Sequence, residues 1–397
     1  MLRIGSAWVL ALALALGCGG DDSGTGQPTD NFDRLSMLAN LGDNLLVPVY
    51  QQFQSSSAEL EAAVASYCSA LGTADETVRL GDAQAAWSAT MDSWQLAEAM
   101  LFGPAAMNER TLREQVYSWP AVSSCAVDQE VAAYLGEPST VDIATKLNNR
   151  RGLDAIEYLL FSTELNHTCP VQTAPAGWNE LAAPDRQAAR CGYAGLAAAD
   201  VAVRANTVVN AWSPSGDNFI GDLKSAGLSG SSFDSAQEAV NVVSDALFYL
   251  DTEVKTMKLG EPAGITLNSC NTAMEPCPDE LESQFASRSK EHVIANLRGA
   301  ALLYAGDSLA GDPGLGFDDF LIELGAEDLA TTLSSELAAA RAAADAIPGS
   351  LRDALTANYA EVAATHEAAR QVTVQLKSQF LTVLGLDLPD SAAGDND

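Results

Sequence analysis

The segment Asp82 to Phe102, DAQAAWSATMDSWQLAEAMLF, decides the fold class of this chain. Its bulky apolar residues Trp87, Met91, Trp94 and Leu101 follow one another at spacings of four, three and seven, which places them on one face of a helix. Alternating apolar and polar runs bounded by tight-turn dipeptides, the pattern of strands, do not stand out anywhere. The sequence therefore predicts an all-α protein. The same helical period continues over residues 34–71, 140–162, 184–212, 233–258, 279–305, 326–346 and 350–385.

The length of the chain predicts two bundles of helices rather than one. At roughly 150 residues per domain, 397 residues correspond to two domains. The segment Ser213-Pro214-Ser215-Gly216-Asp217 is rich in turn-forming residues and is the best candidate for the break between them. We therefore expect an N-terminal bundle over residues 34–215 and a C-terminal bundle over 216–386. The acidic tail, residues 387–397, is expected to be disordered.

The N-terminus has the pattern of an export signal. Arg3 is followed by an apolar run from Ala7 to Leu16 and by a small residue, which predicts a signal peptide over residues 1–17. Ala15-Leu16-Gly17-Cys18 resembles a bacterial lipobox, in which Cys18 becomes the lipidated N-terminus. Residues 18–33 would then form a flexible tether. The expected location is the bacterial cell envelope, in the periplasm or at the outer membrane, with plain secretion as the alternative.

Charge and cysteine usage narrow the class of protein. The formal net charge is −32, which excludes a nucleic-acid partner because phosphate backbones would be repelled. The lipid anchor predicts contact with a membrane, and no protein partner can be named. Beyond Cys18 the cysteines are even in number, which predicts disulfides in an exported chain. Pairing sequence neighbours gives Cys68–Cys125, Cys169–Cys191 and Cys270–Cys277.

Residues 152–161, GLDAIEYLLF, place two carboxylates on an apolar helix. Asp154 and Glu157 are three positions apart and share a face. Buried carboxylates are costly unless they pair with a charge or coordinate something. Three explanations stay open: the pair binds a hard cation through oxygen, one carboxyl has a raised pKa and acts as a base, or Arg150 and Arg151 neutralise both.

The order of several short motifs resembles the imelysin family of exported bacterial proteins. Gly152, Asp154 and Glu157 are similar to its GxHxxE segment, with Asp154 where the family has His. The resemblance extends from about residue 37 to residue 385. Its other elements are Trp87, Trp94, Glu98, Phe102-Gly103-Pro104, Tyr117-Ser118-Trp119-Pro120, Leu259-Gly260-Glu261-Pro262, Glu282-Ser283, Asn296, Gly299, Tyr304 and Gly306.

The resemblance implies two helical bundles with a cleft between them. Family members are classed as metallopeptidases or linked with iron uptake. Replacement of the family's His by Asp154 favours harder cations over zinc and removes a proton carrier that works near neutral pH. We therefore expect a binding protein for a divalent or ferric metal ion rather than an enzyme. An imelysin-type peptidase would need another His, such as His292 or His366, in the cleft, and a non-catalytic scaffold is the third alternative.

The candidate site follows from these motifs. Asp154 and Glu157 are the expected metal ligands, and Glu98, one turn after Trp94, is a third candidate. Gly152, Glu282 and Ser283 are expected to line the cleft. Glu282 and Ser283 are placed at the start of helix 279–305, where free backbone N–H groups are available.

Overall fold

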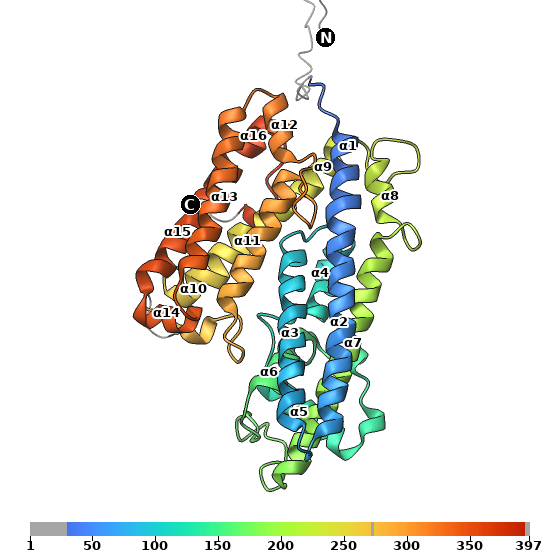
Figure 1. Ribbon diagram of the computed structural model, residues 1–397, viewed down its shortest axis with the longest axis vertical. Coiled ribbons are helices and arrows are strands. Elements are labelled where there is room, and N and C mark those ends of the chain that lie inside the picture. The colour runs from blue at the N-terminus through green and yellow to red at the C-terminus, as the bar shows by residue number, and fades with distance from the viewer. Residues whose placement is uncertain (1–29, 271–273, 394–397) are drawn as a thin grey trace, which may run out of the picture.

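Helices make up the whole architecture of the computed structural model, which describes residues 30–270 and 274–393. Within these residues there is no strand, so the all-α prediction is confirmed. The helices form two packed bundles (Figure 1). The N-terminal bundle contains α1 (Arg34–Asn40), α2 (Val47–Ala70), α3 (Glu76–Glu98), α4 (Met107–Val116), α5 (Ser124–Gly136), α6 (Gly152–Phe161) and α7 (Ala183–Trp212).

The chain after α7 supplies the helices drawn from yellow-green to red in Figure 1. Short α8 lies beside α1, on the side of the N-terminal bundle, and α11, α13 and α15 form the body of the C-terminal bundle. Irregular π-helical segments occur at Leu41–Leu46, Leu250–Gly260 and Leu376–Phe380. The α-helices are α8 (Phe219–Lys224), α9 (Ala236–Ser244), α10 (Glu261–Ala263), α11 (Ser289–Ala305), α12 (Phe317–Glu323), α13 (Glu327–Ala346), α14 (Leu351–Ala357), α15 (Tyr359–Gln375) and α16 (Leu381–Leu384).

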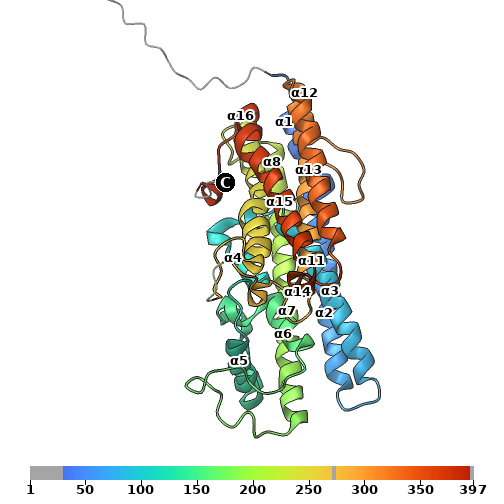
Figure 2. The same ribbon diagram turned by 90° about the vertical axis from the view of Figure 1, so that its left-hand side faces the viewer.

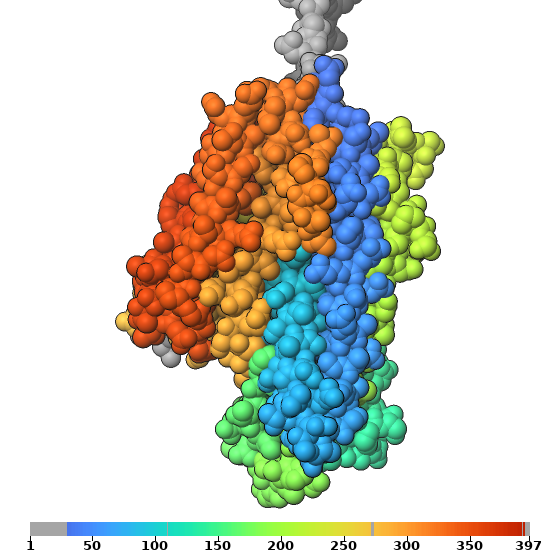
Figure 3. Space-filling view, viewed as in Figure 1, coloured from blue at the N-terminus to red at the C-terminus, as the bar shows by residue number. Residues whose placement is uncertain are grey.

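Helix α3 occupies the centre of the molecule, because it packs against α2 on one side and α11 on the other. Its predicted apolar face is confirmed: Trp87, Met91 and Trp94 are fully buried, and the Trp94 ring lies 5.0 Å from the ring of Phe53. The C-terminal bundle covers only one end of the N-terminal bundle (Figure 3). Turned by 90°, the molecule is elongated, with α5 at the opposite end from α12 and α16 (Figure 2).

Several predicted helix boundaries are wrong. Of residues 140–162, only Gly152–Phe161 is α-helical, and the residues before it form isolated 3₁₀ turns. The predicted helix 279–305 begins at Ser289, because Pro278 starts a 3₁₀ turn and Ser287 has a positive φ of 57°. The predicted helix 350–385 is interrupted at Asn358. The short helices α4, α5, α8 and α12 were not predicted.

Two of the three predicted disulfide pairings are wrong. Cys270–Cys277 forms as expected, but the other bonds are Cys68–Cys191 and Cys125–Cys169. The reason is helix packing: α2 and α7 lie side by side, which brings Cys68 to Cys191 across a sequence separation of 123 residues. Cys68–Cys125 and Cys169–Cys191 therefore do not form, since spatial neighbours rather than sequence neighbours pair.

The structure describes the two ends of the chain only in part. The predicted signal peptide, Cys18 and most of the tether lie outside the described residues. In the tail, residues 387–393 are ordered rather than disordered: Asp387 donates its backbone N–H to Asn241 Oδ1 at 2.6 Å, and Ala392 is buried. Among the described helices, none has the length and apolar character needed to cross a membrane.

Candidate functional site

The start of α6 is fixed tightly against the N-terminal bundle. Gly152 has a φ of 78°, and a Cβ there would lie 2.8 Å from the Val116 carbonyl oxygen, so only glycine fits. Trp87 Nε1 donates a hydrogen bond to the Leu153 carbonyl at 2.8 Å, and Ser118 Oγ donates one to the Arg151 carbonyl at 2.8 Å. These contacts fix the direction in which Asp154 and Glu157 project. Gly152 therefore shapes the site through its backbone.

A cavity of about 150 Å³ lies against α6, and both halves of the chain line it. Five lining residues are acidic and none is basic. The N-terminal half contributes Trp119, Pro120, Val122, Ser124, Asp154, Glu157 and Tyr158; the loop before α11 contributes Asp279, Glu280, Leu281, Glu282, Gln284 and Phe285. The expected cleft is therefore present, and acidic residues supply all of its ionisable Asp, Glu, Lys and Arg side chains.

Glu157 holds the loop that closes this cavity. Its Oε1 accepts hydrogen bonds from Ser283 Oγ at 2.8 Å, Phe285 N at 3.0 Å and Ala286 N at 2.7 Å. Burial raises the pKa of Glu157, while these hydrogen bonds oppose the shift. The backbone N–H groups come from an irregular loop and not from a helix N-terminus as predicted. Ser283 thus contacts Glu157 directly, without appearing among the residues that line the cavity.

Asp154 differs from every other acidic group in the site. The residue is 4% exposed, and neither carboxylate oxygen has a hydrogen-bond partner among the described residues. Burial raises the pKa of Asp154 well above its ordinary value, and the nearby carboxylates Glu157 and Glu282 raise it further. The site therefore contains a buried acid with two acceptor oxygens that the surrounding protein leaves unused.

The hypothesis that Arg150 and Arg151 neutralise the two carboxylates is wrong. Arg151 Nε donates to Asp200 Oδ2 at 2.9 Å, and Arg150 Nη1 donates to Glu130 Oε1 at 2.5 Å. Both arginines therefore pair with acids on α7 and α5, and neither is among the residues that line the cavity. Their role is to fix the turn before α6.

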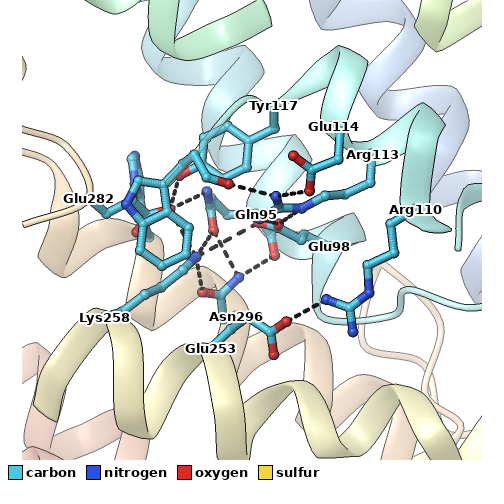
Figure 4. A network of polar contacts seen from close by, with 12 residues as sticks. Gln95, Glu98, Arg110, Arg113, Glu114, Tyr117, Glu253, Lys258, Glu282 and Asn296 are labelled. Atoms are coloured by element: carbon cyan, nitrogen blue, oxygen red, sulfur yellow. Dashed lines mark hydrogen bonds and ion pairs between the residues drawn. The ribbon is translucent and has the colours of Figure 1, made fainter. Parts of the chain in front are cut away.

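Glu282 belongs both to the cavity wall and to a buried polar network (Figure 4). Its Oε1 lies 2.9 Å from Lys258 Nζ and accepts hydrogen bonds from Gln95 Nε2 at 2.8 Å and from the Tyr117 hydroxyl. Burial alone would raise the pKa of Glu282, but the Lys258 ammonium and His292 outweigh it and hold that pKa well below its ordinary value. Glu282 is therefore ionised and compensated.

The remaining donors of Lys258 are also used. Its Nζ donates to Gln95 Oε1 at 2.6 Å and to Asn296 Oδ1 at 2.9 Å, and the side chain is fully buried. Glu98, the proposed third ligand, lies on the far side of this network. Its Oε1 accepts from Arg113 Nε at 2.7 Å, and its Oε2 lies 3.8 Å from Lys258 Nζ. Glu98 does not line the cavity.

The family's His is Asp154 in this chain, and two other histidines were candidates to take its place. His292 is buried on α11, with Nδ1 3.3 Å from Glu282 Oε2, behind the cavity wall. His366 lies on α15, where burial, and then the charge of Lys255, lowers its pKa. Neither histidine is among the residues that line the cavity. Neither histidine therefore takes the place of the family's His in the cavity lining, although the charge of a protonated His292 would oppose the rise in the pKa of Glu157.

The donor set decides which metal would fit. Among the described residues, no three His, Cys, Asp or Glu side chains converge as a ready metal site. The unused oxygens are those of Asp154, and Glu157, which also lines the cavity, accepts its hydrogen bonds from Ser283, Phe285 and Ala286 at Oε1. Such a set fits a hard cation that keeps several water ligands, as Mg²⁺ does with one or two carboxylates. It fits zinc less well, because zinc sites in proteins are built mostly from nitrogen and sulfur ligands.

Sequence reasoning missed Lys258, Arg113 and the cavity-lining residue Phe285. Lys258 directly precedes the motif Leu259-Gly260-Glu261-Pro262, but it lies in the mixed polar and apolar segment DTEVKTMKLGE, where a lysine gives no signal of a buried partner. For Phe285 no signal was available, because its position depends on the irregular loop that Glu157 holds.

Comparisons with known proteins agree on the fold. The family model described as imelysin matches residues 46–379. An imelysin-like protein from Psychrobacter arcticum 273-4 superposes with a TM-score of 0.65 at 18% identity, over 91% of this chain and 99% of that one. A protein from Parabacteroides distasonis ATCC 8503, named "putative iron-regulated protein A precursor", gives a TM-score of 0.67 at 19% identity, over 89% and 95%. A search of curated proteins found no match.

Proposed function

This chain belongs to the imelysin family, and we propose that it is an exported binding protein that holds a cation in the cavity beside Asp154. The observation that carries the proposal is the state of Asp154, whose two oxygens are buried without a partner in the wall of an anionic cavity. A buried carboxylate is expensive unless a charge or a ligand compensates it. A cation in the cavity would supply that compensation.

Oxygen chemistry favours a hard metal ion. Asp154 would provide the first ligand and Oε2 of Glu157 the second, with water completing the coordination shell. Calcium, magnesium, manganese and ferric iron suit such ligands better than zinc does. The P. distasonis protein named as iron-regulated supports a link of this chain to iron supply. Bound in this position, the metal would supply positive charge to the cavity, while the chain's own residues hold and orient it.

Export and lipid attachment belong to the same proposal. Three disulfides support folding in an oxidising compartment. The lipobox-like segment ending at Cys18 supports a lipid anchor in the bacterial cell envelope. Labelled fatty acid should therefore enter the wild-type protein and not a Cys18→Ala variant. Equal labelling of both would contradict the anchor.

The cation is tested by metal analysis and calorimetric titration of the purified protein. Calcium, manganese, zinc and chelated ferric iron are titrated near neutral pH into the wild type, the Asp154→Asn variant and an Asp82→Asn control. Asp82 is an exposed acid on α3 and lies outside the cavity. We expect stoichiometric binding by the wild type and the control, and loss of binding in Asp154→Asn. A folded wild type that binds none of these ions would overturn the metal proposal.

A further inference from the structure

Beyond a metal ion, the same cavity has the size, charge and walls for a small organic cation. We propose that it binds a short aliphatic diamine, with one ammonium group at Asp154 and the other at Asp279 and Glu280. This inference rests on the proposed cation site, since both ligands would use Asp154. A diamine and a metal ion would therefore compete for the cavity.

The carboxylates are arranged in two tiers. Asp154, Glu157 and Glu282 are buried and form the inner tier, whereas Asp279 is exposed and Glu280 is partly exposed. A single metal ion would use only the inner tier, because the acids do not converge on one point. Two positive charges on one chain would use both tiers. Within the lining there is no lysine or arginine to compete with them.

Between the acids, the walls are apolar and aromatic. Trp119, Val122 and Leu281 line the cavity together with Tyr158 and Phe285, whose rings lie 5.0 Å apart. Phe285 is 39% exposed, so its ring is accessible to a ligand in the cavity. Methylene groups gain from contact with such walls, and aromatic rings attract ammonium groups. A hydrated metal ion would gain nothing from them.

The volume limits the length of the ligand. A cavity of about 150 Å³ is comparable to engineered cavities that hold benzene, a molecule of six non-hydrogen atoms. 1,4-Diaminobutane also has six non-hydrogen atoms and carries one ammonium group at each end. It therefore matches the cavity in size, and its two ammonium groups match the two tiers of carboxylates in number.

The probe is 1,4-diaminobutane, titrated calorimetrically into the purified protein beside butylamine, which has one ammonium group, and 1,4-butanediol, which has none. We expect the diamine to bind with one-to-one stoichiometry, butylamine to bind about tenfold more weakly, and the diol not to bind. Manganese should displace the diamine. Nα-acetyl-lysine amide, which presents one side-chain ammonium group, should behave like butylamine; binding as tight as that of the diamine would show that a peptide lysine is the true ligand and would overturn the proposal.

Variants separate the two tiers. Asp154→Asn should lose the diamine, and Asp82→Asn should retain it. A combined Asp279→Asn and Glu280→Gln variant should bind the diamine about tenfold more weakly and leave manganese and butylamine binding unchanged. In the wild type, the Ser269 N–H donates a hydrogen bond to Glu280 Oε1 at 2.8 Å. Glu280→Gln keeps an oxygen that can accept this hydrogen bond.

The possible failures can be distinguished. Manganese binding without diamine binding would overturn this inference and leave the proposed metal function intact. Diamine binding that survives in Asp154→Asn would show nonspecific attraction to the acidic surface and would overturn it as well. Binding of neither ligand by a folded protein would overturn both proposals.

Discussion

The two bundles bury charged side chains around Lys258 and, close by, around Asp154. The two regions differ in how many of these side chains have a partner of opposite charge or a hydrogen bond. The positive charges of Lys258 and Arg113 lie against the negative charges of Glu98 and Glu282, and the donors of Lys258 are all used. Among the described residues, Asp154 accepts no hydrogen bond, and the nearby positive charge of Arg113 only partly opposes the rise in its pKa.

The difference separates a structural network from the proposed ligand site. Buried polar groups whose partners are present make a rigid contact between packed elements. A buried acid without a partner lowers stability, and it is expected where a ligand supplies the missing partner. The central claim is therefore that the network around Lys258 joins the bundles, while Asp154 is kept for a cation.

The largest effect is expected from Lys258→Met. Removing the ammonium leaves Glu282 and Glu98 as buried carboxylates with less compensation, so the free energy of unfolding should fall by about 3–5 kcal/mol. Urea unfolding monitored by circular dichroism measures this change. The control is Lys224→Met, which removes an exposed ion pair with Asp43 and should change stability by less than about 1 kcal/mol. Equal effects of the two variants would contradict a structural role for the network.

The second prediction concerns the backbone that aims Asp154. Gly152→Ala places a Cβ at a positive φ and 2.8 Å from the Val116 carbonyl oxygen. Strain at such a position costs about 1–3 kcal/mol, so the free energy of unfolding should fall by that amount and cation binding should weaken. Gly81→Ala in α3 is the matched control, since nothing lies within 4 Å of its Cβ. That change should stabilise the protein by about 0.5–1 kcal/mol.

The third prediction is a gain in the free energy of unfolding, whereas the first two are losses. The folded-state pKa of Asp154 is raised, so above the unfolded pKa of about 3.9 the unfolded chain releases a proton that the folded protein retains. The stability cost of Asp154 therefore grows as pH rises through this window, by about 1.4 kcal/mol per pH unit, until the folded pKa is reached. Asp154→Asn removes the ionisable group and should be more stable than the wild type at pH 7.

Thermal unfolding at pH 4 and at pH 7 measures this effect, with Asp82→Asn as the control. The gain of Asp154→Asn over the wild type should be clear at pH 7 and should shrink toward pH 4. A variant less stable than the wild type at pH 7 would show that Asp154 makes a stabilising contact in the folded protein.

The long helices could be predicted from the sequence because their apolar residues repeat with a helical period. Trp87, Met91 and Trp94 are buried as that pattern requires. Short helices such as α4 and α5 carry too few turns for a clear period. The disulfide Cys68–Cys191 depends on the packing of α2 against α7, which no local pattern encodes.

For the candidate site, the sequence indicated the acids but not their partners. Asp154 and Glu157 share a helix, so their proximity follows from spacing alone. Whether Arg151 turns toward Asp154 or toward Asp200 depends on where α7 packs, and the structure places it at Asp200. Lys258 reaches the site from the other half of the chain, so its role could not be deduced from local sequence.

The most direct test of the central claim compares the unfolding temperatures of the wild type and Asp154→Asn at pH 7, with and without manganese. Without the ion, the variant should be the more stable protein. With manganese at about 100 times its dissociation constant, the wild type should gain about 2.7 kcal/mol, while the variant should not respond. Equal shifts of both proteins on adding manganese, or no shift of the wild type, would contradict the account.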